Sequence, residues 1–181
     1  NDSGTSSTTD QALHTSEWLT GSDQPRFTRG DGAGNARISY AVVEFTGGNW
    51  VIQRIEHTQD DTGPQYESLG QAVGSTNRAF VHAQTRTDAG NLDEQGLLIW
   101  LSSTSQVAFE RMGTASGTQV GVGWVIENTE TNASYEMSVE HVVGNRPSGG
   151  SEPDVWSGNV SAVSAVSNSS VMGECSISTG G

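Results

Sequence analysis

Lysine is absent from this chain of 181 residues, and all eight of its basic residues are arginines. Against 21 acidic residues they leave a formal net charge of −13 at neutral pH. A surface with this excess of negative charge repels phosphate backbones, which argues against nucleic acid as a partner. The same charge favours solubility and suits an acidic extracellular protein or a salty setting, where screening weakens self-repulsion.

Cysteine and long apolar runs are scarce as well. Cys175 is the only cysteine, so the chain can form neither an internal disulfide nor a thiolate metal cluster. Its thiol is expected to be buried and inert, the alternative being a pair between two chains. The longest apolar run, Leu97–Leu101, is far shorter than the roughly 20 residues of a membrane-spanning helix, so no membrane insertion is predicted. Aromatic residues make up only 7% of the chain, whereas 23 residues are glycine, which is typical of an all-β protein with many turns.

The sequence contains an internal repeat. Trp18–Arg29 aligns with Trp100–Arg111 at an offset of 82 positions, with five of twelve residues identical. Two further matches keep the order: Val42-Val43-Glu44 with Val125-Ile126-Glu127 at an offset of 83, and Ile55-Glu56-His57 with Val139-Glu140-His141 at an offset of 84. A match that holds its order and slips only at loops indicates a duplicated unit.

Glycine, asparagine, aspartate and proline divide the chain into short segments with alternating apolar residues, and no segment has a helical period. In the first copy the predicted strands are Leu13–Leu19, Arg26–Arg29, Ala36–Phe45, Trp50–Thr58, Tyr66–Val73 and Arg78–Thr87. In the second copy they are Leu97–Ser102, Gln106–Arg111, Gln119–Glu127, Ser134–Val142, Val155–Val166 and Val171–Ser178. We therefore predict an all-β fold of two tandem six-stranded antiparallel sandwich or barrel units.

The limits of the two units depend on where the repeat begins. If each unit folds from its own six strands, a polar arm at 1–10 precedes units at 11–93 and 94–181. If the unit begins at Trp50, residues 50–127 form a central unit, and 11–49 must pair with 128–181 in the same chain or in a neighbour. Pairing between chains by strand addition would polymerise the protein.

Repeated large residues are interpreted as the structural core. These positions are Trp18, Phe27 and Arg29 in the first copy and Trp100, Phe109 and Arg111 in the second. We expect the tryptophans and phenylalanines to be large buried anchors. The arginine lies two positions after the phenylalanine, hence on the same strand face, where its stem should pack and its guanidinium should cap a loop or an acidic partner such as Glu44 or Glu127.

One acidic loop has the residue types of a calcium site. Asp88, Asn91 and Asp93 could supply oxygen ligands there, although the spacing does not fit an EF-hand and an ordinary solvated loop is the simpler interpretation. No nucleophile–base set or carboxylate pair is singled out by its spacing, and the Glu-His pair recurs in both copies, which indicates structure rather than catalysis. We predict a non-enzymatic protein without a cofactor.

Aromatic and asparagine residues suggest a connection to glycans. Trp50, Tyr66 and Trp156 could stack on sugar rings if they are exposed. Asn132, Asn159 and Asn168 each begin an Asn-x-Ser acceptor motif, but in a chain so rich in serine a few such motifs are expected by chance.

Four segments carry a resemblance to a known kind of repeat: Ala79-Phe80-Val81-His82-Ala83, Leu98–Trp100, Val107-Ala108-Phe109-Glu110-Arg111 and Gly123-Trp124-Val125-Ile126-Glu127. Their core-and-turn spacing resembles the β-rich tandem-repeat modules of phage tail or virion proteins and of large bacterial surface proteins. The sequence departs from the pattern at Ala41, where the second copy carries Trp124. The resemblance implies a non-enzymatic structural or adhesive module in a virion or outside the cell.

We therefore expect a structural, self-assembling β-protein of a virion, an extracellular filament or a surface layer, whose partners are copies of itself. A lectin-like carbohydrate-binding adhesion module is the second function class. Exposure of Trp50 and Trp156 together on one face would favour this second class.

Overall fold

The computed structural model describes residues 14–18, 21, 24–29, 39–87, 97–111, 118–132, 137–139 and 141. Within these residues the protein is all-β, with three small antiparallel sheets and a single 3-10 turn, η1 (Thr76–Arg78). The predicted all-β, antiparallel class is confirmed, whereas none of the three sheets closes into a barrel. The division into two duplicated six-stranded units stays a prediction.

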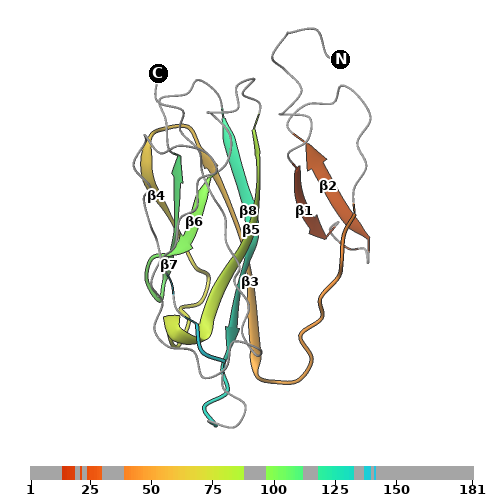
Figure 1. Cartoon of the computed structure of the whole chain (residues 1–181), viewed down its shortest axis with the longest axis vertical. Helices are drawn as coiled ribbons and strands as arrows, with labels where there is room; N and C mark the ends of the chain where they lie inside the picture. The colour runs from red at the N-terminus through yellow and green to blue at the C-terminus, as the bar shows by residue number, and fades with distance from the viewer. Residues whose placement is uncertain are drawn as a thin grey trace, which may run out of the picture.

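Two of the sheets face each other as a β-sandwich (Figure 1). In the first sheet, β8 (Gln119–Asn128) lies between β3 (Trp50–Gln59) and β5 (Ala79–Thr87). In the second sheet, β7 (Gln106–Arg111) lies between β4 (Gly63–Ser68) and β6 (Leu98–Leu101). In the first sheet both partners of the central strand are distant in the chain, whereas in the second sheet β7 pairs with the adjacent β6 and with the distant β4.

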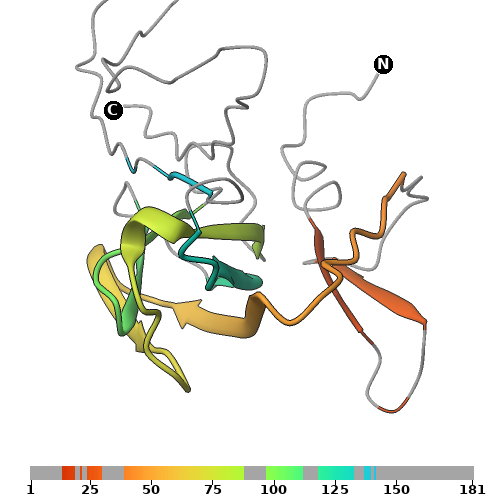
Figure 2. The ribbon, with the colours of Figure 1, turned by 90° about the horizontal axis from the view of Figure 1, so that it is seen from below.

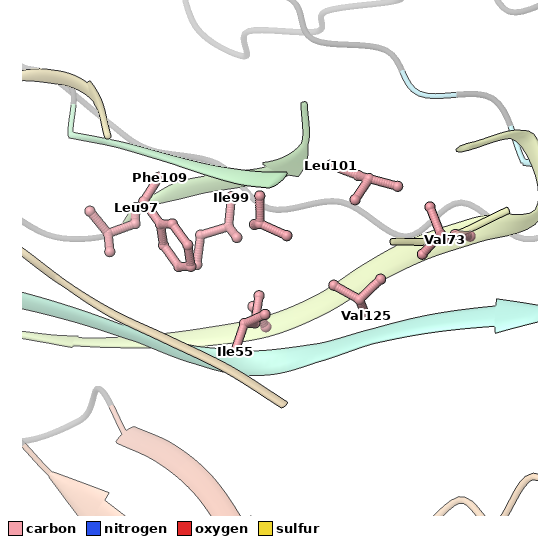
Figure 3. Packing of buried hydrophobic residues seen from close by; sticks show 10 residues of the cluster. Ile55, Val73, Leu97, Ile99, Leu101, Phe109 and Val125 are labelled. Atoms are coloured by element: carbon pink, nitrogen blue, oxygen red, sulfur yellow. The ribbon is translucent and has the colours of Figure 1, made fainter. Parts of the chain in front are cut away.

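The core of the sandwich lies between these two sheets (Figure 3). Ile55 and Val125 point from the first sheet toward Ile99, Leu101 and Phe109 of the second. Because side chains alternate along a strand, every second residue of β3 and β8 faces this layer. Burial of one such large apolar side chain contributes about 1.5–3 kcal/mol, so this cluster is the main source of stability.

Close packing around β8 depends on two glycines. A Cβ atom added to Gly121 would stand 2.8 Å from the Phe109 ring, and one added to Gly123 would stand 2.4 Å from the His82 carbonyl oxygen. Real Cβ atoms do not approach other atoms so closely, so glycine is needed at both positions. These glycines let β8 approach the facing sheet on one side and β5 on the other.

The third sheet is a hairpin of β1 (His14–Trp18) and β2 (Pro25–Arg29) that contacts β5 and β8. Ser16 Oγ donates to Gln84 Oε1 at 2.6 Å, and Arg86 Nε donates to Thr15 Oγ1 at 3.2 Å. Gln84 and Arg86 alternate with the core-facing residues of β5, so the hairpin covers the outer face of the first sheet (Figure 2).

Most of the predicted strands within the described residues are present, with ends shifted by one residue or by none. The prediction at Tyr66–Val73 is misplaced, because β4 spans Gly63–Ser68. The predicted strand Ala36–Phe45 is wrong for its described part, because residues 39–45 form no strand pairing with any other described residue. Residues 137–139 and 141 likewise carry no strand, and the predicted strands 155–166 and 171–178 lie outside the described residues.

Candidate functional site

The predicted repeat core is only partly found where it was expected. Phe109 is fully buried, whereas Trp18 is 49% exposed, so the interpretation of Trp18 as a buried anchor is wrong. Phe27 and Trp100 are partly buried. The two copies also differ in strand register.

The two hairpins that the repeat makes equivalent, β1–β2 and β6–β7, are both antiparallel, but their registers differ by one residue. Trp100 pairs with Ala108, whose counterpart in the first copy is Arg26, yet Trp18 pairs with Pro25. A slip of one residue exchanges the two faces of a strand relative to its partner. Equivalent residues therefore meet different surroundings.

Arg111 caps a loop, which is one of the two roles predicted for its guanidinium. Its side chain is 5% exposed, and its Nη2 atom donates to the Asp60 carbonyl oxygen at 3.2 Å, in the connection between β3 and β4. The other suggested partner, Glu127, accepts a hydrogen bond from the Gly74 amide at 2.6 Å. The side chain of Arg29 lies outside the described residues.

A chain of charged side chains connects the hairpin to β3. Glu17 accepts from Arg26 and from Arg54, and Arg54 also contacts Glu56, with Arg54 Nη2 lying 2.7 Å from Glu17 and 2.6 Å from Glu56. The hydrogen bond from Arg26, opposed by partial desolvation and aided by the charge of Arg54, lowers the pKa of Glu17. Burial lowers the pKa of Arg54, but the hydrogen bond and charge of Glu56, together with Glu17, outweigh it and raise the pKa.

Both histidines of the repeated Glu-His pair make structural contacts. The His57 ring packs 4.9 Å from the Phe109 ring, and its Nε2 atom lies 2.8 Å from Gln65 Oε1. His141 Nε2 lies 3.0 Å from the Thr76 carbonyl oxygen and 2.9 Å from that of Ala79. Carbonyl oxygens only accept, so this nitrogen carries the proton. No group of three or more His, Cys, Asp or Glu that could hold a metal ion occurs in the described part of the chain.

The proposed sugar-stacking residues are not brought together by the described structure. Trp50, at the start of β3, is partly buried, and its ring packs 4.8 Å from that of Phe45. Tyr66 is 53% exposed and lies on β4, in the other sheet of the sandwich. Trp156 lies outside the described residues, as do Asp88, Asn91 and Asp93 of the calcium candidate and Cys175. Asn132 is exposed, whereas Asn159 and Asn168 are outside the described residues.

The most unusual surface feature is the Tyr40–Phe45 segment, which joins the hairpin to β3 (Figure 1). Tyr40, Val42 and Val43 are 60%, 59% and 69% exposed. Their side chains favour strands, yet the segment makes no backbone hydrogen bond with any other described residue. It is held at its two ends by ring contacts, Phe27 with Tyr40 at 5.1 Å and Phe45 with Trp50.

Sequence reasoning identified this segment as a strand but missed its exposure. An exposed apolar segment with unpaired backbone groups is a site for association rather than for chemistry. The signal that could have found it is its match to β8, a strand that is buried on both faces in the other copy.

Comparison with protein-family models, with curated proteins and with solved structures finds no match to this chain. In the part of the chain that the structure describes, no helix is long and apolar enough to cross a membrane. The residues of the Tyr40–Phe45 segment and the sandwich beside it are therefore the features that bear on function.

Proposed function

We propose that this chain is a non-enzymatic structural β-protein that assembles with copies of itself in a virion, an extracellular filament or a surface layer. The observation that carries this proposal is the Tyr40–Phe45 segment, which is apolar, extended and exposed. A monomer gains nothing from keeping such a segment in water, because each exposed valine forgoes the free energy of burial. Association that covers the segment recovers this free energy.

The sandwich beside the segment supports the same proposal. Its core is fully formed from β3 to β8, so it can act as a rigid body that carries the segment. The Glu17–Arg54 contact ties the hairpin to this body and thereby limits the positions that the segment can take. Limiting these positions before association lowers the entropy that association costs.

The net charge of −13 makes assembly dependent on salt. Chains with so much like charge repel one another at low ionic strength, and the repulsion is screened over about 10 Å at 0.1 M salt. We therefore expect assembly to strengthen as salt is added.

Particle mass tests this proposal. Light scattering and negative-stain imaging of the purified chain, over a range of protein and salt concentrations, should show regular polymers or large closed particles. A dispersed species of 19.0 kDa at every protein and salt concentration would contradict self-assembly.

A lectin-like carbohydrate-binding module is the second candidate, and the observation that favours it is the exposed Tyr66 ring. An exposed aromatic face can stack on a sugar ring. Binding to a glycan array that is lost in Tyr66→Ala and kept in Tyr66→Phe would support this candidate. Equal binding by wild type, Tyr66→Ala and Tyr66→Phe, or no binding by any of them, would rule out this candidate.

A further inference from the structure

We infer that the Tyr40–Phe45 segment is the central strand of an incomplete second sandwich, and that residues 134–178 of another copy of this chain complete it. This inference rests on the proposed function of self-assembly and specifies the surfaces that meet. The partner is thus a second copy of the chain, joined by strand complementation.

The Tyr40–Phe45 segment corresponds in sequence to β8. Val42-Val43-Glu44 matches Val125-Ile126-Glu127, which lies within β8. Strand β8 is paired along both of its edges, with β3 on one side and β5 on the other. Its counterpart, in contrast, is paired along neither edge by the described residues.

The counterpart of β8 comes with the rest of a half-sandwich. By the repeat, β1 and β2 correspond to β6 and β7, and both hairpins are antiparallel, with registers that differ by one residue. The Phe27 ring contacts Tyr40, as the Phe109 ring contacts β8 beside Gly121. Tyr40 stands where β8 carries Gly123, a position at which β8 has no room for a side chain, so the two segments differ in their packing at this point.

Segments that match the three missing strands in sequence follow Asn128. The counterparts of β3, β4 and β5 are the segments 134–142, 155–166 and 171–178. By this match, the sequence before Trp50 corresponds to one half of the sandwich and the sequence after Asn128 to the complementary half. If each chain offers one set of these strands to one neighbour and the complementary set to another, the chains join head to tail. Such contacts give open polymers or closed rings.

Contacts of the described residues favour pairing between chains over pairing within one chain. The Val139 amide donates to the Asn77 carbonyl oxygen at 2.7 Å, and His141 contacts the Thr76 and Ala79 carbonyls, so this part is anchored at the start of β5. Tyr40–Phe45 is anchored elsewhere, by Phe27 and Trp50, and Figures 1 and 2 show the two segments apart. Both keep their described contacts if each meets its complement on a neighbour.

The register of the new strand pair follows from the observed one. In the β3–β8 pair, Val125 lies opposite Gln53 and Ile126 opposite Ile52. The counterpart of a β8 residue lies 83 positions earlier in the chain, and the counterpart of a β3 residue lies 84 positions later. The two pairs therefore become Val42 opposite Met137 and Val43 opposite Glu136. Adjacent pairs in an antiparallel ladder alternate between a wide and a narrow spacing, so at least one of them suits a disulfide.

Cross-linking between separately prepared chains tests the inference. In a Cys175→Ser background, which removes the only cysteine, one preparation carries Val42→Cys and another carries Met137→Cys. The two are mixed at low salt, assembled by adding salt, and oxidised with copper phenanthroline. We expect a reducible product of twice the 19.0 kDa mass in the mixture and little in either preparation alone.

Two matched experiments accompany this one. Val43→Cys with Glu136→Cys samples the neighbouring pair, so a variant that fails to fold in one pair leaves the other usable. Tyr66→Cys, exposed on β4 and outside the proposed contact, is mixed with Met137→Cys as the control and should give at least tenfold less product. Thermal melts of every variant should match that of Cys175→Ser.

The outcomes separate this inference from the proposed function. Cross-links in the mixture above the control support strand complementation between chains. Assembly of Cys175→Ser by light scattering without cross-links at either pair overturns the inference and leaves self-assembly intact. If the Val42→Cys, Met137→Cys double variant forms this disulfide within one chain, and the mixture of single variants forms none, the second sandwich is completed within one chain. This outcome also overturns the inference. Failure to assemble under any condition removes both.

Discussion

Gly123 of β8 and Ala83 of β5 lie so close that a Cβ atom on Gly123 would stand 2.5 Å from the Ala83 Cβ and 2.6 Å from its Cα. The two strands are paired at this point in the ladder. The central strand of the first sheet therefore tolerates no side chain here, and this contact sets the spacing between β8 and β5.

Replacing Gly123 with alanine should destabilise the protein by about 1–3 kcal/mol, because the neighbouring backbone must shift to make room. Thermal unfolding should show a decrease in Tm of several degrees. Gly48→Ala is the matched control, since a Cβ at Gly48 meets nothing within 4 Å and should leave Tm nearly unchanged. Equal Tm values for the two variants would contradict the close approach of β8 and β5.

Arg111→Ala should lower the free energy of unfolding by about 1–3 kcal/mol. The change removes a buried donor from the Asp60 carbonyl oxygen and leaves a gap beside β7. Arg26→Ala, at a side chain that is 54% exposed, serves as the control and should cost much less. Urea denaturation of both variants measures the difference, and an unchanged value for Arg111→Ala would show that the loop needs no cap.

Arg54→Gln should weaken the attachment of the hairpin in a manner that depends on pH. The lowered pKa of Glu17 means that its ion pairs contribute stability above the ordinary value of 4.5 and lose it as the pH falls through the lowered pKa. The contribution should be below about 1 kcal/mol, because Arg54 is 42% exposed and solvent screens the pair.

Urea titrations of wild type and Arg54→Gln at several pH values check this expectation. The stability difference should be present at neutral pH, shrink in acid and shrink again in high salt. A difference that persists at a pH well below the lowered pKa of Glu17 would show that Arg54 acts through packing instead.

Val42→Asp should abolish assembly without lowering the thermal stability of the single chain. Val42 is 59% exposed in the chain, so a charge there meets water, but in a completed sandwich it would occupy the place of the fully buried Val125. Val42→Ile is the matched control and should still assemble. Light scattering gives the particle mass of both variants, and large particles of Val42→Asp would argue against burial of this residue on association.

The strands of the sandwich could be predicted from local pattern because their inward residues alternate. Ile55 on β3 belongs to such an alternating set, whereas β8 is buried on both faces and is recognised by its short run of valines and glycines; the ends of both strands fall within one residue of the prediction. The order of strands in the sheet could not be predicted, because pairing of β8 with both β3 and β5 leaves no trace in the sequence near any of them.

Placement of the repeated residues was less predictable. Trp18 and Trp100 look equivalent in the sequence, but sequence identity does not record a register shift of one residue, and only the pairing partners distinguish them. The Tyr40–Phe45 segment was predicted as a strand from its composition. Its exposure depends on which partners the rest of the chain provides, and composition does not contain that information.

Because β8 is the central strand of the first sheet, this sheet can form only after β8 has been synthesised. Among the described strands, β3 and β5 each pair with β8 and with no other strand. Neither β3 nor β5 can therefore form its backbone hydrogen bonds in this sheet before the ribosome has released residue 128. Every earlier strand of the first sheet must wait in solution with unpaired backbone groups, and non-local pairing of this kind is slow. The nascent chain is thus exposed to premature association until β8 has emerged, and its high negative charge counteracts that hazard by repulsion between chains.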